Sequence, residues 1–504
     1  MNNSLKKRLL SVAMAAVMVF SLLPATAWAA MAENLPAASG QTRTEQKRGG
    51  SDTYTVTRDV KSVAAAQTGA VKKVICLDLT TGEDQVSLDA DGGYRWVAGA
   101  NYLYLYKVHI EAEGSNALVL PAGATVEVVG KCSITGGGAN ECAVWSKGDV
   151  TVGLGQDAAL TVNGLGWRAE GNLTVAHAYD AYTGGELTVN YNGTSSDNGT
   201  SGAAIYMGGN TLYVEQGARV TANGSGIGNV KAKDSCGVKG AVHVDGGAEL
   251  AADGGSAGST GISYGIFGSV TVKNGTVTAN GGRGLQSYGV SGDSVSVSDG
   301  GVLNANGGTA VQDLNSGIKP ISGGIYLGNN AVIENATVNA SGGVAPCGDS
   351  FASVGLQMTS RSEVTVNSGG VLNANGGQLT NGSSANEANG FSAGINMMGA
   401  GAANLFVNGT GRVTAIGDPQ RLDGGTVRSY GVNHTDMGEL TIELSGVASF
   451  KAAGGTAASR AAFTPDTVSI KGSEAYRDFD NVTDGYKFFN STYVRNDVLA
   501  QSLV

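Results

Sequence analysis

The stretch Val277-Thr278-Ala279-Asn280-Gly281 decides the fold, because variants of it return throughout the central part of the chain. Similar stretches begin at Val220, Leu250, Leu303, Val338 and Leu372, with degenerate copies at Val413 and Phe450. Their central alanines are separated by 30, 27, 26, 35, 34, 41 and 37 residues. A conserved strand phrase with spacers of variable length is typical of a solenoid rather than of one closed core.

Two further phrases precede this one in each repeat. One resembles Ser263-Tyr264-Gly265-Ile266, and the other alternates apolar and polar residues, as in Val270-Thr271-Val272. Alternation predicts half-buried strands, and pairs such as Asp299-Gly300 predict turns between them. We therefore predict an all-β, single-stranded, right-handed parallel β-helix with three short strands per coil, roughly ten to fourteen coils and an N-terminal cap.

The rival architecture is a string of small β-sandwich domains. Sandwich domains need a larger apolar core per unit, whereas aromatic residues make up only 6% of this chain. The repeats are also too short for that fold, which favours the β-helix.

One position of the repeat carries Asn or Asp and is predicted to form a structural turn ladder. Asn and Asp tolerate left-handed backbone geometry, bond their own turns and can bond along a stack. The alternative, that Asn is only a good turn residue, has equal weight. The ladder residues are Asn223, Asp253, Asn280, Asn306 and Asn375.

The N-terminal segment has the pattern of a secretory signal, with Lys6, Lys7 and Arg8 before an apolar stretch and cleavage near Ala29. The mature protein is predicted to be secreted or located at the cell surface, without a transmembrane segment, and monomeric. The expected domains are a signal peptide (1–29), a flexible leader (30–52), an N-terminal β cap (53–107), the parallel β-helix (108–462) and a C-terminal cap or the start of a further domain (463–504).

Charge and cysteine usage exclude some partners. The formal net charge of −10 becomes −13 once the three positive charges of the signal are removed, which argues against nucleic acid. Cysteine spacing fits no zinc site, and a Cys132–Cys142 bridge is left open. The cysteines of the chain are Cys76, Cys132, Cys142, Cys236 and Cys347.

No catalytic, metal or cofactor site is predicted. Glycoside cleavage needs two converging carboxylates, but Asp245, Asp299 and Asp313 fall in Gly-rich turns. His109 and His243 replace outward strand residues and are expected to be solvated. Residues 89–93 are expected to form a simple acidic turn rather than a calcium loop.

Polar spacers and a few aromatic residues are the candidate binding elements. Tyr264, Tyr288 and Tyr430 occupy equivalent positions, for which packing is favoured over sugar stacking. The spacers follow the same strand, so they are expected at one corner of the solenoid, where loops commonly bind ligands. They comprise residues 225–240, 307–323, 342–355, 376–394 and 417–431.

The signal, the repeat rhythm and the phrase Leu120-Pro121-Ala122-Gly123-Ala124-Thr125-Val126 resemble secreted pectin-lyase-like β-helix surface proteins of Gram-positive bacteria. The resemblance covers roughly residues 100 to 460. It implies a carbohydrate-binding or adhesin-like protein but carries over no catalytic residue. The predicted function is an extracellular, non-catalytic scaffold that binds glycans or cell-surface polymers through loops on one corner. The alternatives are a structural stalk without a ligand and a polysaccharide lyase or glycoside hydrolase.

Overall fold

A computed structural model describes most of the chain between residues 72 and 453. Within that span it leaves out residues 139–140, 180–182, 194–201, 225–233, 258–260, 312–318, 347–350, 381–389, 418–427, 435–438 and 447. Outside it, the described residues are those of five strands, at 41–45, 54–58, 459–463, 468–472 and 486–490. The chain divides into two units, Met1–Ala70 and Val71–Val504.

The first unit contains one described hairpin. Its strands β1 (Gln41–Glu45) and β2 (Tyr54–Arg58) pair antiparallel, with Gln41 opposite Arg58. The predicted leader therefore includes a strand, whereas the predicted signal peptide lies outside the described residues.

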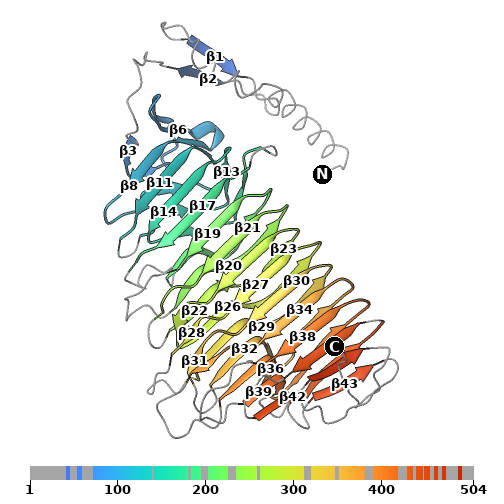
Figure 1. Ribbon diagram of the computed structural model, residues 1–504. Helices are drawn as coiled ribbons and strands as arrows, with labels where there is room; N and C mark the ends of the chain where they lie inside the picture. The colour runs from blue at the N-terminus through green and yellow to red at the C-terminus, as the bar shows by residue number, and fades with distance from the viewer. Residues whose placement is uncertain are drawn as a thin grey trace. The chain divides into compact units, whose positions relative to one another are not determined.

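A 14-stranded sheet runs through the described part of the second unit (Figure 1). Thirteen of its strands are parallel to their neighbours, and only the last pairs antiparallel, with the strand before it. Its strands are, in order, β3 (Lys72–Ile75), β8 (Val108–Glu111), β11 (Lys131–Gly136), β14 (Ala159–Gly164), β17 (Glu186–Tyr191), β19 (Arg219–Asn223), β21 (Glu249–Asp253), β24 (Thr276–Asn280), β27 (Val302–Asn306), β30 (Thr337–Ser341), β34 (Val371–Asn375), β38 (Arg412–Ile416), β41 (Ser449–Ala453) and β44 (Tyr486–Asn490).

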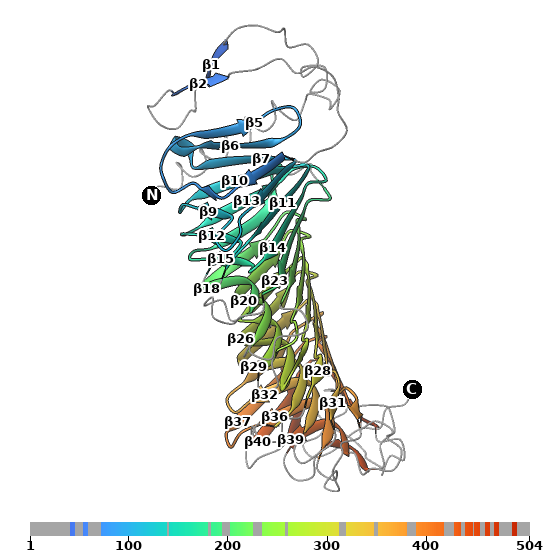
Figure 2. The same cartoon turned by 90° about the vertical axis from the view of Figure 1, so that its left-hand side faces the viewer.

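A 24-stranded sheet supplies the other strands of each repeat (Figure 2). Its strands are β4 (Leu77–Asp78), β5 (Gln85–Leu88), β6 (Gly93–Val97), β7 (Tyr102–Tyr106), β9 (Leu118–Leu120), β10 (Ala124–Val129), β12 (Val144–Ser146), β13 (Val150–Leu154), β15 (Trp167–Ala169), β16 (Leu173–His177), β18 (Ala203–Val214), β20 (Ser235–Asp245), β22 (Ile262–Phe267), β23 (Val270–Lys273), β26 (Gln286–Ser298), β29 (Ile321–Glu334), β32 (Ala352–Thr359), β33 (Glu363–Val366), β36 (Phe391–Met398), β37 (Ala402–Val407), β39 (Arg428–His434), β40 (Glu439–Leu444), β42 (Ser459–Phe463) and β43 (Val468–Gly472).

We call one strand of the 14-stranded sheet, with the strands of the 24-stranded sheet that precede it, a coil. The prediction of three short strands per coil holds for β22, β23 and β24. In β18, β20, β26 and β29 the first two strands instead run on as one long strand. The register of β26 on β29 shifts between Gly292 and Ser294, so the chain bends there without leaving the ladder.

The helices and strands of the described residues are all β-strands apart from one short 3-10 helix, η1 (Ala98–Ala100). Successive coils pair in parallel and in register, which is consistent with a β-helical solenoid. No helix in the described part of the chain is long and apolar enough to cross a membrane.

The parallel stack begins one coil earlier than predicted, because β3 pairs with β8 through Lys72 and Val108. Within the predicted cap, β5, β6 and β7 add two antiparallel pairings to the 24-stranded sheet. Trp96 on β6 is buried in the main core. At the other end β42 and β43 still pair in parallel with β39 and β40, so the parallel pairing continues past residue 462 to β43.

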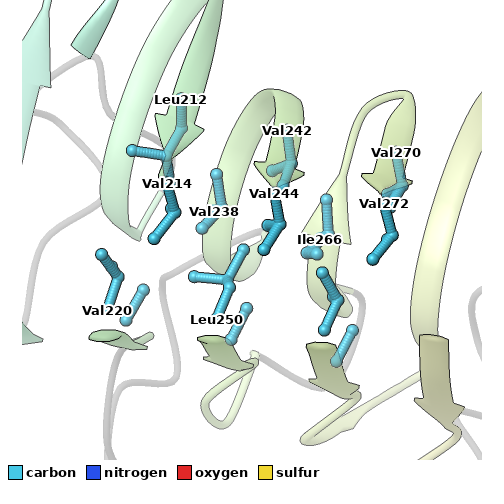
Figure 3. Close-up of a cluster of buried hydrophobic side chains, with 14 of the residues drawn as sticks. Leu212, Val214, Val220, Val238, Val242, Val244, Leu250, Ile266, Val270 and Val272 are labelled. Carbon is cyan, nitrogen blue, oxygen red and sulfur yellow. The ribbon is translucent and has the colours of Figure 1, made fainter. Parts of the chain in front are cut away.

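The core lies between the two sheets and is built largely from alternate residues of the strands, although β9 and most of β32 and β36 are buried at consecutive positions. Figure 3 shows Val214, Val244 and Leu250 among the side chains that point into this space from neighbouring coils. The third strand of the repeat contributes alanines that are fully buried, such as Ala252 and Ala279. Burial of these apolar side chains is the main force holding coil on coil.

A glycine is required in the Ser-x-Gly phrase because two strands approach closely there. A Cβ atom added to Gly289 would lie 2.4 Å from the backbone nitrogen of Asn306 and 2.6 Å from the carbonyl oxygen of Ala279. The backbone of β26 thus rests directly on the ends of β24 and β27, and only glycine leaves room for that contact.

The serine of the same phrase is fully buried in seven successive coils. Ser287 Oγ donates to the carbonyl oxygen of Gly282 at 2.8 Å and accepts the N–H of Gly308 at 2.9 Å. The same alternation of hydroxyl and glycine backbone is repeated in neighbouring coils. We call this chain of bonds the serine ladder; its members are Ser235, Ser263, Ser287, Ser322 and Ser353.

Candidate functional site

The structure places the five predicted ladder residues at the ends of strands in the 14-stranded sheet, where all are half-buried. Asn223, Asp253, Asn280 and Asn306 lie in register on successive strands. The Asn280 amide donates to Asp253 at 2.6 Å, and the Asn306 amide donates to Asn280 at 2.9 Å. Asn375 lies two strands further along, on the far side of Ser341.

The expected left-handed backbone at these positions is wrong. The ladder residues end extended strands, whereas the left-handed residues lie at the opposite corner, before each strand of the 14-stranded sheet. Asn274, Asp299 and Asn335 have φ of 48°, 53° and 47° there. Asn, Asp and Gln at that corner take the geometry expected of the ladder.

The other residues singled out from the sequence are dispersed. Cys76, Cys132, Cys142 and Cys236 are free thiols, so Cys132 and Cys142 are not bridged, and Cys347 lies outside the described residues. Burial raises the pKa of the Cys142 thiol to about 11. His109 hydrogen-bonds Ser133 at 2.7 Å.

The three equivalent tyrosines lie in one register of the 24-stranded sheet. Tyr264 and Tyr288 stack at 6.2 Å between ring centroids and are both buried, which favours packing over sugar stacking. Burial raises the pKa of both phenols. Tyr430 lies in the same register as Tyr288, four coils further along. Its ring centroid is 6.5 Å from that of Phe391.

The most unusual set of side chains lies in register on the 24-stranded sheet. Each member directly follows the buried aliphatic or aromatic residue of the first strand, such as Val144 or Ile205. The first five members and Tyr326 are at least partly exposed, whereas Ser291, Gln357, Asn396 and Asn433 are buried. We call this set the outer column: Trp145, Arg168, Tyr206, Lys239, Phe267, Ser291, Tyr326, Gln357, Asn396 and Asn433.

Aromatic and cationic side chains alternate over its first five members, which we call the aromatic–basic segment. They lie on β12, β15, β18, β20 and β22; Figure 2 shows β12, β15, β18 and β20 one below another, and β22 pairs with β20. Neighbouring strands are about 4.8 Å apart, so aromatic residues on alternate strands recur about every 10 Å.

Cations lie close to the aromatic rings. Lys147 Nζ is 2.8 Å from the Trp145 ring centroid, and the Arg168 guanidinium carbon is 5.5 Å from it on the other strand. Lys239 Nζ is 5.8 Å from the Tyr206 ring and 5.7 Å from the Phe267 ring. These contacts fix the positive charges between the rings.

One acidic residue partly offsets this charge. Glu170 Oε1 is 3.5 Å from Arg168 Nη2, and the two side chains are 40% and 36% exposed. An ion pair at this exposure contributes little, so the guanidinium remains available to another anion.

Three buried polar atoms of the outer column have no hydrogen-bond partner. They are Trp145 Nε1, Arg168 Nε and Gln357 Oε1, and the described residues contain only one other such side-chain atom, Trp96 Nε1. A buried donor or acceptor without a protein partner costs free energy.

A second hydrophobic cluster anchors the rings from behind. Tyr206 and Tyr326 pack against it, and it is separate from the main core. Its members are Ala203, Cys236, Tyr264, Tyr288, Ile321, Ala352 and Val354. Rings held in this way lose little freedom on binding a ligand.

The sequence analysis missed the outer column because its residue types change from coil to coil. From Lys239 onward the sequence offered a positional signal, since the column residue follows the apolar residue after the Ser-x-Gly phrase, as Lys239 follows Val238; the coils of Trp145, Arg168 and Tyr206 lack that phrase. Most of each predicted binding spacer lies outside the described residues. Among the residues that are described, no group of three or more His, Cys, Asp or Glu is placed to hold a metal ion.

Comparison of the chain with protein-family models, curated proteins and solved structures finds no match.

Proposed function

We propose that this chain is a secreted, non-catalytic, right-handed parallel β-helix that binds a carbohydrate polymer along its outer column. The observation that carries the proposal is the alternation of aromatic rings and cations on five successive strands of one sheet. Aromatic rings, cations and amides arranged in one line suit a chain of sugars, whose rings offer apolar faces and hydroxyl edges.

The proposal keeps the carbohydrate-binding, adhesin-like function suggested by the resemblance to pectin-lyase-like surface proteins of Gram-positive bacteria. The proposed binding surface is a face of the 24-stranded sheet, whereas the sequence predicted the corner loops. A polymer suits this surface because the partly exposed aromatic–basic segment extends over five successive strands, and weak contacts on successive coils add through multivalency.

Local roles for the acidic side chains support a non-catalytic function. Asp245 accepts the N–H of Gly246 at 2.6 Å, and Asp89 accepts N–H bonds from Asp91 and Gly92 at 3.1 and 3.3 Å. These carboxylates stabilise turns, which is the role that the sequence predicted for them.

Alanine substitutions on a single strand test the location of the site. Tyr206→Ala is expected to weaken polysaccharide binding about tenfold, or about 1.4 kcal/mol, because a stacking ring is lost. Tyr213→Ala is the matched control, since Tyr213 lies on the same strand, β18, outside the column. Affinity electrophoresis of the full chain against a polysaccharide panel measures both.

Equal affinity of both folded variants and the parent would place the site elsewhere. Failure of the parent chain to bind any polysaccharide would favour the structural stalk, and release of cleaved sugars would favour the enzyme.

A further inference from the structure

We propose that the open edge of β5 binds an extended, basic peptide segment of a partner protein, which joins the 24-stranded sheet as a further strand. The site is separate from the outer column and does not depend on carbohydrate binding. The evidence is an edge strand with exposed apolar side chains and with carboxylates beyond both of its ends.

One backbone edge of β5 has no neighbouring strand. The strand pairs antiparallel with β6 on one side, and no described strand pairs with its other side. Figure 2 shows β5 above β6 and β7, as the outermost of the three. An edge strand presents unpaired N–H and C=O groups in a row, which is the template that another extended chain requires.

Two apolar side chains of β5 are exposed instead of being buried in the core. Val86 is 65% and Leu88 is 37% exposed, and both lie on the same face of the strand. Apolar neighbours on an added strand would remove these side chains from water. The pattern therefore calls for a partner segment with two apolar residues separated by one residue.

The edge of β5 lacks the residues that commonly protect an open edge. Lysine and proline discourage strand addition, and the segment Gln85-Val86-Ser87-Leu88 contains neither. The other open strand at this end, β3, pairs only with β8 among the described strands and begins with Lys72-Lys73. Of these two edges, β5 is thus the one suited to accept a strand.

Carboxylates beyond both ends of β5 determine the charge of the partner. Glu83 and Asp84 precede the strand, Asp89 and Asp91 follow it, and all of them are exposed. Arg95 is the only cation on β5 and β6, so it offsets only part of this negative charge. An extended segment with Lys or Arg at both ends is complementary to this arrangement.

A second copy of β5 does not meet that requirement. Antiparallel pairing centred on Ser87 would place Val86 opposite Leu88 of the copy. The same register would also place Glu83 opposite Asp91 at each end. Like charges that face each other across paired strands are destabilising, so the carboxylates favour a basic segment of another protein over self-association.

Synthetic peptides titrated with the full chain, with fluorescence anisotropy as the readout, test the proposal. The probe carries two valines separated by one threonine, with a pair of lysines at each end. Three control peptides carry glutamate in place of lysine, serine in place of valine, or N-methyl groups on every peptide nitrogen between the lysines. The probe is expected to bind at least about tenfold more tightly than each control.

A pair of matched variants locates the peptide on the protein. Val86→Lys is expected to weaken binding of the probe at least about tenfold, because it puts a like charge on the edge. Val332→Lys on β29 adds the same charge at a 40% exposed valine of the same sheet, and is expected to change affinity by less than about twofold. Hydrogen exchange of the parent chain is expected to slow at β5 and not at β29 when the probe is added.

Four outcomes would overturn the proposal. Failure of the probe to bind would do so, as would equal binding of the N-methylated peptide, since charge attraction alone would then explain the affinity. Equal effects of Val86→Lys and Val332→Lys, or unchanged exchange at β5, would place the peptide elsewhere. Dimerisation of the parent chain that Val86→Lys abolishes would identify a second copy as the occupant. None of these outcomes affects the proposed polysaccharide site, because β5 lies outside the outer column.

Discussion

At the scale of single residues, the serine ladder shows how one hydroxyl group can serve two coils. The backbone N–H of Gly308 and the carbonyl group of Gly282 both find a partner in Ser287. Buried backbone groups need such partners, because leaving them unpaired costs more than the bond itself contributes. Ser287 on β26 thus links the first strand of its coil to Gly282, which follows β24, and to Gly308, which follows β27.

Ser287→Ala is therefore expected to lower the free energy of unfolding by about 2 kcal/mol, because one N–H and one carbonyl group lose their partner. Ser296→Ala on the same strand, β26, is the control, since Ser296 lies at a half-buried outward position. Urea denaturation followed by circular dichroism measures both changes. Equal effects of the two substitutions would mean that the ladder contributes nothing specific.

At the scale of elements, close contact between the two sheets determines where glycine must occur. The Cβ of an alanine at position 289 would overlap the backbone at Asn306 and Ala279, and neither strand can move without disturbing its own ladder. The contact recurs at Gly265, Gly324 and Gly355, where the nearest backbone nitrogen would be 2.5 to 2.6 Å from the added carbon.

Gly289→Ala is expected to destabilise the protein by about 3 kcal/mol, at the upper end of the usual cost of overpacking. Gly99→Ala is the control, because no atom lies within 4 Å of a Cβ at that position. Thermal unfolding of both variants measures how much stability each substitution removes. A loss of stability for Gly99→Ala as large as that for Gly289→Ala would show that close packing is not the reason for the glycine.

The strands themselves could be predicted from the sequence because each alternates clearly. Val277, Ala279 and their equivalents face the core as expected. The first parallel strand was missed because Lys72-Lys73-Val74-Ile75 carries no repeat phrase and pairs with a partner 36 residues away. The sequence prediction assigned left-handed backbone to the wrong corner of the coil. Asn is favourable both in a left-handed turn and at the end of a strand, where its side chain bonds the Asn or Asp of the next strand.

At the scale of the whole molecule, the outer column forms only because successive coils pair in register. Trp145, Arg168 and Tyr206 are 23 and 38 residues apart in sequence, yet pair in register on adjacent strands. No local motif could reveal them, because their chemistry alternates instead of repeating. Local pattern determines which residues turn outward, whereas the spacer lengths determine which outward residues become neighbours.

The order of the side chains is thus the central claim, and an exchange of two of them tests it most directly. Arg168→Tyr combined with Tyr206→Arg keeps composition and net charge but gives the order aromatic, aromatic, cation, cation, aromatic. Affinity electrophoresis against the same polysaccharide panel is expected to show that the affinity for the bound polysaccharide falls about tenfold, with an unchanged unfolding transition. Affinity equal to that of the parent chain would contradict the account, because the line of alternating rings and charges would then not be what the ligand recognises.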